Sequence, residues 1–304
     1  MFDCKNGGGA YFRVTAESGL NIRKGPSLSS DKITKIPYGS MVYGCEYCDH
    51  CQEEIIEGKK GIWKKVFFAA YEGFVFSGFL DAVPKVEVFC PSDWMSQKDE
   101  PAFKKGTTYF GLYEDLQNRE QSRVSVFEGQ DTTYENPAIG VVRVIKQDPQ
   151  NSPSFIVSGI DLAENQTVDG IHFKSRMLYP GESIPYGRSI IYAVGDVDVS
   201  EESSLEPVQS IRNYKLIIRE QSVEGAGPKE EVLFDLNLSH WSNGFFEGGA
   251  RIRWVGDIDG DNKLDILLTY SPHYACYQVI LFLSTRAIGP RLLGETATYT
   301  VCGC

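Results

Sequence analysis

The chain has 304 residues, of which 42% are hydrophobic and 12% aromatic, and its formal net charge is −11. This composition is that of a globular protein with a sizeable core, and it excludes wholesale disorder. The sequence contains no apolar run of the ~18 residues that a membrane-spanning helix needs. We therefore expect a folded chain, long enough for two domains, without a transmembrane segment.

The charge is unevenly distributed along the chain. Residues 1–85 hold 11 Lys and Arg against 10 Asp and Glu, a balance of +1, whereas residues 86–304 hold 19 against 31, a balance of −12. Binding to nucleic acid needs a basic face that neutralises phosphates. The acidic main body therefore argues against a nucleic-acid partner.

The eight cysteines indicate an oxidising compartment, because their number is even and they cluster towards both ends of the chain. The start Met1–Asp3 lacks the apolar segment of a signal peptide. Cys4 and the glycines after it resemble the start of a bacterial lipoprotein, in which an acylated cysteine precedes a flexible tether. A disordered N-terminus with an ordinary disulfide cysteine fits residues 1–10 equally well.

Residues 11–83 contain short runs of alternating apolar and polar side chains separated by Gly-centred turns, a pattern that predicts a small β-barrel. Four motifs follow one another: Gly-Leu-Asn-Ile-Arg-Lys-Gly-Pro-Ser at 19–27, Pro-Tyr-Gly at 37–39, Trp-Lys-Lys-Val at 63–66 and Gly-Phe-Val-Phe-Ser-Gly-Phe-Leu at 73–80. Together these motifs resemble the bacterial SH3 (SH3b) family over nearly the whole module. The resemblance implies a non-enzymatic module of an exported bacterial protein that binds cell wall or peptide.

A cluster of three thiols and one imidazole departs from this family pattern. Cys45, Cys48, His50 and Cys51 lie within seven residues of one loop. Side chains of this kind can bind zinc, with Cys90 as an extra ligand. A disulfide that staples the loop, with the odd cysteine paired elsewhere, is the simpler interpretation in an oxidising compartment.

Beyond the module, the pattern changes twice. Three prolines and a charged run disfavour regular structure in residues 84–106, which we predict to be a connector. From 107 to 304 the pattern is that of a larger β-rich domain, sandwich-like or mixed, so the whole chain is predicted to be all-β. We interpret the acidic run Gly195–Glu202 as a loop. The candidate strands are 107–113, 123–127, 140–145, 154–158, 171–178, 189–194, 214–219, 231–236, 251–255, 265–270 and 277–284.

Three cysteines belong to the end of this β-rich domain. Cys276 lies in or beside a predicted strand, and Cys302 and Cys304 follow the last predicted strand. A disulfide from Cys276 to one of the other two would attach the C-terminus to the domain. The sequence does not specify which of them is the partner.

One acidic segment has the spacing of a metal site. Between two apolar β-like runs, Asp257, Asp259, Asp261 and Asp265 occupy positions 1, 3, 5 and 9 of a loop. Alternate side chains of a tight turn can point at one centre, and hard oxygen ligands suit Ca²⁺. Position 6 is not Gly and position 12 is not Glu, which argues against an EF-hand.

The spacing resembles instead the short calcium loop of FG-GAP and integrin-α-type repeats, including their VCBS-like versions. That resemblance implies a structural Ca²⁺ bound by the four aspartate side chains and by the carbonyl of Lys263. Gly260 and Asn262 suit the positive φ that such a turn needs, and Ile258 and Leu264 can anchor it in a core. A solvated acidic turn without metal is the alternative, although four carboxylates this close repel one another.

No motif of catalysis is evident in the sequence, which lacks a Gly-x-Ser-x-Gly elbow, a His-Glu-x-x-His pair and a phosphate loop. Cys90 is followed by Pro91, which opposes the helix that carries the nucleophile of cysteine peptidases. We therefore expect a non-enzymatic bacterial envelope protein in the periplasm, at the outer membrane or at the cell surface. Its SH3b module would bind peptidoglycan, peptide, glycan or an envelope protein. A structural subunit of a periplasmic or extracellular assembly is the alternative, and an unrecognised cell-wall hydrolase is a weaker one.

Overall fold

The computed structural model describes residues 9–45, 52–90, 94–96, 103–104, 106–115, 117–127, 131–136, 140–145, 153–200, 208–221, 227–241, 245–247, 249–273 and 276–302. Within these segments every regular element is a β-strand or a single turn of 3-10 helix, which confirms the all-β prediction. None of the helical turns described is long and apolar enough to cross a membrane. The chain divides into two compact units. Unit 1 is Met1–Lys85 with Arg286–Gly294, and unit 2 is Val86–Thr285 with Glu295–Cys304.

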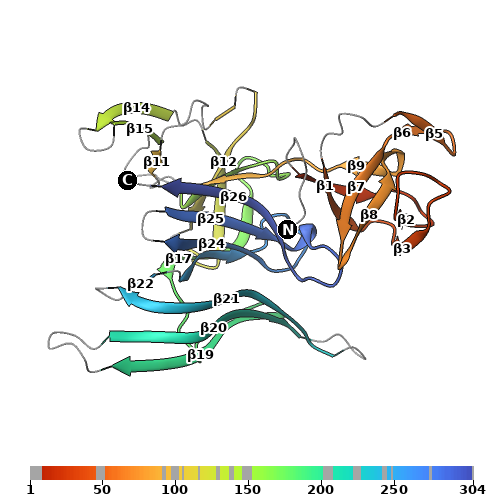
Figure 1. Ribbon diagram of the computed structural model, residues 1–304. Coiled ribbons are helices and arrows are strands. Elements are labelled where there is room, and N and C mark those ends of the chain that lie inside the picture. Colours follow the sequence, from red (N-terminus) through yellow and green to blue (C-terminus); the bar gives the residue numbers. More distant parts are fainter. Residues whose placement is uncertain are drawn as a thin grey trace. The chain divides into compact units, whose positions relative to one another are not determined.

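Unit 1 is a barrel-like sheet of seven short strands, accompanied by a separate hairpin of two (Figure 1). The strands of the sheet are β1 (Gly9–Val14), β2 (Leu20–Arg23), β3 (Lys32–Ile36), β4 (Met41–Cys45), β7 (Trp63–Phe68), β8 (Tyr71–Phe76) and β9 (Leu80–Ala82). The hairpin is β5 (Glu54–Ile56) and β6 (Lys59–Gly61), and the 3-10 turn η1 (Ser77–Phe79) precedes β9. The spatial order of the sheet is β3-β2-β8-β7-β4-β1-β9.

Side chains at alternate positions of these strands form the core of unit 1. On β2, Leu20 and Ile22 are buried, whereas the residue after each is partly exposed, as the two-residue period of a strand requires. Burying one such side chain contributes about 1.5–3 kcal/mol. The ring centroids of Trp63 and Phe76 lie 5.8 Å apart in a second cluster with Ile56, which joins the hairpin to the sheet. The main core cluster is Phe12, Val14, Leu20, Ile22, Ile36, Val42, Val66 and Val75.

The first strand begins earlier than the sequence suggests. Gly9 and Ala10, expected in the tether at 1–10, start β1 and pair with β4. Pairing of the main chain with β4 makes these two small residues part of the strand. Glycine and alanine give no alternation of apolar and polar side chains from which a strand could be predicted. Residues 1–8, with the lipidation candidate Cys4, lie outside the described residues.

A segment from late in the sequence, Arg286–Gly294, belongs to unit 1. Arg286 is buried, and its Nη2 donates a hydrogen bond to the carbonyl of Pro84 at 3.3 Å. Ile288 and Leu293 are buried as well. The prediction of one continuous domain over 107–304 is therefore wrong in this segment, because the burial of these side chains depends on contacts distant in sequence.

Gly289 and Gly39 form a matched pair that tests this arrangement. Both have positive φ, 67° and 75°, but a Cβ on Gly289 would lie 2.7 Å from the Cβ of Ala69, whereas one on Gly39 would meet nothing within 4 Å. We expect Gly39→Ala to cost unit 1 about 1 kcal/mol through backbone strain alone. Gly289→Ala should cost about 2–4 kcal/mol, because it adds a steric clash. Hydrogen exchange of unit 1 amides measures both, and equal effects would contradict the packing of this segment.

Unit 2 contains three sheets in its described part (Figure 1). The nine-stranded sheet is, in spatial order, β10 (Glu87–Phe89), β16 (Phe155–Ser158), β12 (Phe110–Glu114), β13 (Gln121–Val126), β17 (Thr167–Arg176), β23 (Ala250–Gly256), β24 (Asp265–His273), β25 (Cys276–Leu283) and β26 (Gly294–Cys302). The five-stranded sheet is β18 (Ser183–Tyr186), β19 (Ser189–Ser200), β20 (Val208–Glu220), β21 (Lys229–Trp241) and β22 (Phe245–Glu247). The three-stranded sheet is β11 (Trp94–Ser96), β15 (Gly140–Ile145) and β14 (Asp131–Asn136), and the turn η2 (Ser284–Arg286) follows β25.

The connector predicted at 84–106 is partly wrong, because it contains two strands. β10 pairs with β16, and β11 pairs with β15. Phe89 of β10 contacts Tyr299 of β26 with ring centroids 5.2 Å apart, so the first and last strands of the nine-stranded sheet approach each other. Pro84 lies before β10 and does not interrupt its pairing, which is why proline density misled the prediction here.

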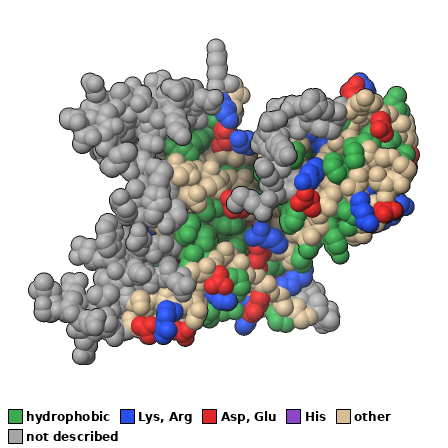
Figure 2. All heavy atoms as spheres, in the orientation of Figure 1, with side chains coloured by type: hydrophobic (Ala, Val, Ile, Leu, Met, Phe, Trp, Pro, Cys, Tyr) green, Lys and Arg blue, Asp and Glu red, His purple; other side chains and the backbone are tan. Residues whose placement is uncertain are grey.

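The acidic run Gly195–Glu202 is not a loop where the structure describes it. Residues 195–200 belong to β19, which continues past a bulge next to Val194 and pairs with β20. Asp198 there forms an exposed ion pair with Arg212 of β20, with an N–O distance of 2.6 Å. Figure 2 shows acidic and basic side chains together at the lower edge of this unit. Cross-strand pairing of opposite charges therefore accommodates an acidic strand that looked like a loop.

Trp254 of β23 lies at the centre of the unit 2 core. It is fully buried, and its ring packs edge-on against Phe155 with centroids 5.6 Å apart. Its Nε1 donates to the hydroxyl of Ser122 at 2.9 Å, and that hydroxyl is 2.8 Å from Nε2 of His172. Three strands, β13, β17 and β23, are thereby joined through one buried polar contact.

The partly buried His172 gives unit 2 a predictable pH dependence. Burial lowers the pKa of His172 from its ordinary 6.5 to about 4. The unfolded chain therefore binds more protons than the folded chain between these values, and stability falls as pH decreases through this window. The loss amounts to about 3 kcal/mol at most, at about 1.4 kcal/mol for each pKa unit. We expect His172→Gln to lose less stability than the wild type between pH 7 and pH 4 in urea titrations. Parallel pH profiles would contradict this role.

Candidate functional site

The loop predicted to bind metal connects β23 to β24 in unit 2. Ile258 and Leu264 are buried and anchor it in the core. Gly260 and Asn262 have φ of 76° and 61°, the left-handed conformation that the turn requires. The local structure predicted for this loop is therefore confirmed at all four residues.

Two carboxylates hold the loop in shape by accepting hydrogen bonds from its main chain. Asp257 accepts from three N–H groups of the loop at 2.8–3.0 Å. Asp265 is fully buried and accepts from the N–H of Ile258 at 2.9 Å and of Ser284 at 2.8 Å. Hydrogen bonds to a charged acceptor contribute about 1.5–3 kcal/mol each, so the curl depends on these aspartates.

Three of the four predicted aspartates come together. Their carboxylate oxygens lie within 4.8 Å of one another, and the residues are Asp257, Asp259 and Asp265. Asp261 is engaged elsewhere: it accepts from the N–H of Lys263 at 2.9 Å and from the hydroxyl of Ser284 at 2.7 Å. The ammonium of Lys263 lies 3.6 Å from the same carboxylate. The converging ligand atoms are all carboxylate oxygens, which fits a hard cation such as Ca²⁺.

The electrostatics of this cluster favour a positive charge. Burial raises the pKa of Asp265 well above its ordinary value, and the carboxylate of Asp259 raises it further, against the lowering effect of main-chain N–H groups. Thr285, after β25, donates a hydrogen bond to Asp259. A cation between these groups would favour their ionised forms. Ser284 and Thr285 give no signal in the sequence, because they reach the loop only through the pairing of β25 with β24.

A pocket of about 430 Å³ lies beside this loop. Asp257 and Asn262 line it from the loop, and Glu120, Asp169 and Tyr186 line it from neighbouring strands and turns. Burial raises the pKa of the Tyr186 phenol, and the carboxylates of Asp169 and Asp257 raise it further. The phenol therefore remains a neutral hydrogen-bond donor in acidic surroundings.

The loop cysteines are only partly described. Cys45 is disulfide-bonded, and a sulfur in a disulfide is not a thiolate ligand for zinc. Cys48, His50 and Cys51 lie outside the described residues. Cys90 is a buried member of the unit 2 core. The disulfide interpretation therefore stands for Cys45, and its partner stays a prediction.

The C-terminal cysteines occupy neighbouring strands. Cys276 begins β25, and Cys302 ends β26, the next strand of the sheet. Cys304 lies outside the described residues. The predicted disulfide between Cys276 and one of the other two stays a prediction.

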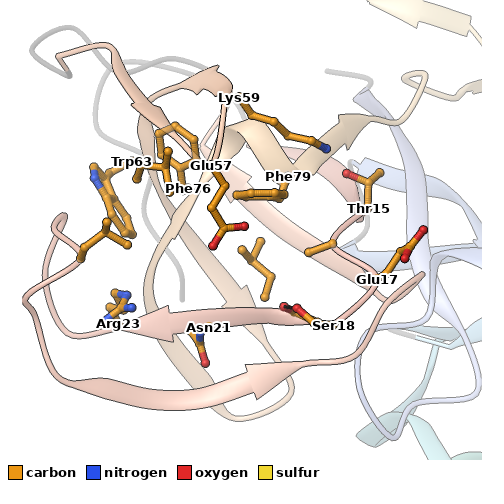
Figure 3. A pocket seen from close by; sticks show the side chains of 15 residues that line it. Thr15, Glu17, Ser18, Asn21, Arg23, Glu57, Lys59, Trp63, Phe76 and Phe79 are labelled. Carbon is orange, nitrogen blue, oxygen red and sulfur yellow. Dashed lines mark hydrogen bonds between the residues drawn. The ribbon is translucent and has the colours of Figure 1, made fainter.

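A second candidate site is a groove of about 550 Å³ in unit 1 (Figure 3). One side is the segment from Thr15 to Arg23 with Leu28, and the other carries Glu57 and Lys59. Both sides adjoin an aromatic floor of Trp63, Phe76 and Phe79. Three of the motifs that resemble SH3b, at 19–27, 63–66 and 73–80, thus contribute lining residues. Sequence reasoning missed Glu57 and Lys59, which lie outside these motifs.

The aromatic floor is held in place by its own contacts. Trp63 donates from Nε1 to the carboxylate of Glu54 at 3.2 Å, and the ring centroids of Phe76 and Phe79 lie 6.2 Å apart. The ammonium of Lys59 lies 4.8 Å from the centroid of the Phe79 ring, within reach of a cation–π interaction. The groove is therefore an open surface over a fixed apolar base, with charged groups at its rim.

Comparisons of the chain with models of protein families, with curated proteins and with solved structures found no match. The class of protein is therefore defined by its fold and by its candidate sites. The chain is an all-β protein with a barrel-like unit that carries an open groove, and with a larger β unit that carries an acidic loop.

Proposed function

We propose that this chain is a non-enzymatic binding protein of the bacterial envelope, whose unit 1 binds peptidoglycan through the groove. The observation that carries the proposal is that three motifs resembling SH3b converge on one groove with an apolar floor and polar rim. Small-molecule and peptide sites have this composition: mostly apolar surface with a few polar groups that orient the ligand. We choose the cell wall as the partner because of the SH3b resemblance. The acidic main body of the chain argues against nucleic acid.

The chemistry of the rest of the chain supports an extracytoplasmic location. The disulfide at Cys45 is the kind of bond that persists in oxidising compartments. Cys4 is the candidate for a lipid anchor at the outer membrane. Both features are compatible with attachment of the protein close to its proposed wall ligand.

The acidic loop of unit 2 binds Ca²⁺ in a structural role. In this proposal the three converging carboxylates, Asp257, Asp259 and Asp265, hold the ion. The calcium-loop resemblance adds the carbonyl of Lys263 and Asp261, and Asp261 would have to leave the hydroxyl of Ser284 to join them. Bound there, the ion neutralises the clustered charge and fixes the connection between β23 and β24. Its effect is on the stability of unit 2, not on a reaction.

Two exposed aliphatic residues test the groove. Leu28 lines it and is 56% exposed, whereas Ile55 of β5 is 74% exposed and does not line it. Leu28→Asp should lower the affinity for purified peptidoglycan about tenfold, the equivalent of about 1.4 kcal/mol, because it places a charge on the apolar path of the ligand. Ile55→Asp introduces the same charge elsewhere on the unit and should leave the affinity within about twofold.

Co-sedimentation of the full chain with peptidoglycan measures both variants. Circular dichroism and melting curves control for folding, which neither exposed position should disturb. Equal binding of peptidoglycan by wild type and Leu28→Asp would contradict the groove as the binding site. A wild-type chain that does not sediment with peptidoglycan would overturn the wall-binding function itself.

A structural subunit of an envelope assembly is a second candidate function, favoured by apolar side chains on the long strands of unit 2. Val194 and Val197 of β19 and Val232 of β21 are 39%, 49% and 47% exposed. A partner that packed on this sheet would remove these apolar groups from water. This function predicts a stable co-purifying partner that Val197→Lys displaces. Recovery of the chain alone from cell-envelope extracts would argue against it.

A further inference from the structure

The pocket of about 430 Å³ in unit 2 is lined by carboxylates from three separate segments. Glu120 directly precedes β13, Asp169 belongs to β17, and Asp257 begins the acidic loop. The carbonyl of Glu120 accepts a hydrogen bond from the N–H of Gly170 at 2.8 Å. The carbonyl of Asp169 accepts one from the N–H of Asp257 at 3.0 Å. The three carboxylates are therefore carried by main chain that is joined in one arrangement, as a preformed site requires.

The basic residues near this pocket in the sequence do not line it. Arg119, Arg188 and Lys263 each stand next to a lining residue, and none of the three belongs to the lining. Nη2 of Arg188 donates to the carbonyl of Gln221 at 2.9 Å, and the ammonium of Lys263 lies 3.6 Å from the carboxylate of Asp261. Among the residues that the structure describes, no Lys, Arg or His lines the pocket. Its lining is therefore acidic, without a basic side chain to offset the charge.

The spacing of the carboxylates suits an organic cation better than a second metal ion. In the described part of the chain, the acidic side chains that lie close enough to share one metal ion are Asp257, Asp259 and Asp265. Glu120 and Asp169 are not members of that group. An ammonium group has three N–H donors and can contact acceptors on different sides of a pocket, with charge-assisted hydrogen bonds to carboxylates.

The remaining lining groups suit an alkyl chain that ends in such an ammonium. Ile171 and Pro185 contribute apolar surface, and the side-chain amide of Gln121 offers an oxygen acceptor. The phenol of Tyr186 can donate to a carboxylate while its oxygen accepts from a ligand. Alkyl chains with a charged end lie along apolar surface and keep the charge among polar groups. The volume is in the range of about 300–1,000 Å³ that small-molecule sites occupy.

We propose that this pocket binds a primary alkylammonium group, with the N–H groups at Glu120 and Asp169 and the alkyl chain against Ile171. Asp257 already accepts hydrogen bonds from three N–H groups of its own loop, so the other two carboxylates provide most of the recognition. The inference goes beyond the peptidoglycan binding proposed for unit 1 and does not depend on it. A free amine and a lysine side chain of another protein both supply this chemistry.

Calorimetric titration of the full chain at a fixed Ca²⁺ concentration tests the assignment. Pentylammonium is the probe, pentanol is its neutral analogue, and pentyltrimethylammonium keeps the charge without N–H donors. The wild type should bind pentylammonium at least tenfold more tightly than either analogue. Glu120→Gln and Asp169→Asn should each lower that affinity about fivefold, because each removes one exposed charge. Asp161, an exposed aspartate between β16 and β17, does not line the pocket, and Asp161→Asn should bind as the wild type.

Methyl NMR of the wild type gives a second readout that needs no variant. Pentylammonium should shift the resonance of Ile171, which lines the pocket, and leave that of Ile55 in unit 1 unchanged. Acetyl-lysine methylamide carries the same ammonium on a peptide unit, and tighter binding of this probe than of pentylammonium would identify a lysine side chain as the source.

Three outcomes would overturn the inference. Equal affinities for pentylammonium and its two analogues would mean that the pocket does not recognise an ammonium group. Equal losses of affinity in Asp169→Asn and Asp161→Asn would mean that amines bind the acidic surface of unit 2 without a site. Absence of a shift at Ile171 with both amines would mean that the pocket stays empty. None of these results would bear on peptidoglycan binding by unit 1.

Discussion

Replacing Gly256 with alanine is expected to lower the free energy of unfolding of unit 2 by about 3 kcal/mol or more. Gly256 lies opposite Gly170 on β17, and a Cβ there would be 2.2 Å from the ring of Trp254 and 2.3 Å from the carbonyl oxygen of Asp169. Neither neighbour can yield at low cost, because one is a fully buried ring and the other is main chain. Urea unfolding of the variant and the wild type measures the difference.

Gly227 provides the control for this substitution. A Cβ on Gly227 would meet nothing within 4 Å, so Gly227→Ala should change stability by no more than about 0.5 kcal/mol. Equal unfolding curves for the two variants would show that the core does not close on Trp254 as described. If only Gly256→Ala lowers the free energy of unfolding, the stability of unit 2 depends on the close packing of Gly256 against the ring of Trp254.

Removal of Ca²⁺ is expected to lower the melting temperature of unit 2 by about 5–10 °C. An ion that binds only the folded state stabilises it by about 2.7 kcal/mol at 100 times its dissociation constant. For a unit of this size, each kcal/mol corresponds to about 2–4 °C. Calorimetric melting in Ca²⁺ and in chelator measures the shift. Asp259→Asn should abolish it, because one of the three converging carboxylates is neutralised.

Asp198 offers the matched control for the calcium experiment. It is an exposed aspartate of the other acidic run, on β19, where it forms an ion pair with Arg212. Asp198→Asn should retain the full calcium-dependent shift. A wild-type melting temperature that is the same in Ca²⁺ and chelator would mean that the loop is an acidic turn stabilised by its own hydrogen bonds.

The strands were predictable because alternation of apolar and polar residues is a local signal. The run at 140–145 coincides with β15, and that at 189–194 is the first half of β19. The pairing of strands was not predictable, because register depends on contacts between distant segments, such as Gly170 with Gly256. The inclusion of Arg286–Gly294 in unit 1 was not predictable either, because it also depends on contacts between segments distant in sequence.

The candidate sites show the same division. Spacing predicted correctly that Asp257, Asp259 and Asp265 converge, because a tight turn brings alternate side chains together. The diversion of Asp261 to Ser284 could not be read from spacing, since it needs the end of β25 beside the loop. In unit 1 the motifs predicted a module but not a groove, whose charged rim arises where separate segments meet.

Binding in the groove is measured most directly by methyl NMR of the full chain titrated with soluble peptidoglycan fragments. Leu20, Leu28 and Ile56 line the groove, whereas Ile55 and Val197 are exposed elsewhere and serve as internal controls. The predicted result is saturable shifts at the three lining residues with no change at the two controls. Shifts confined to Val197, or no shift at any of the three lining residues, would contradict binding in the groove.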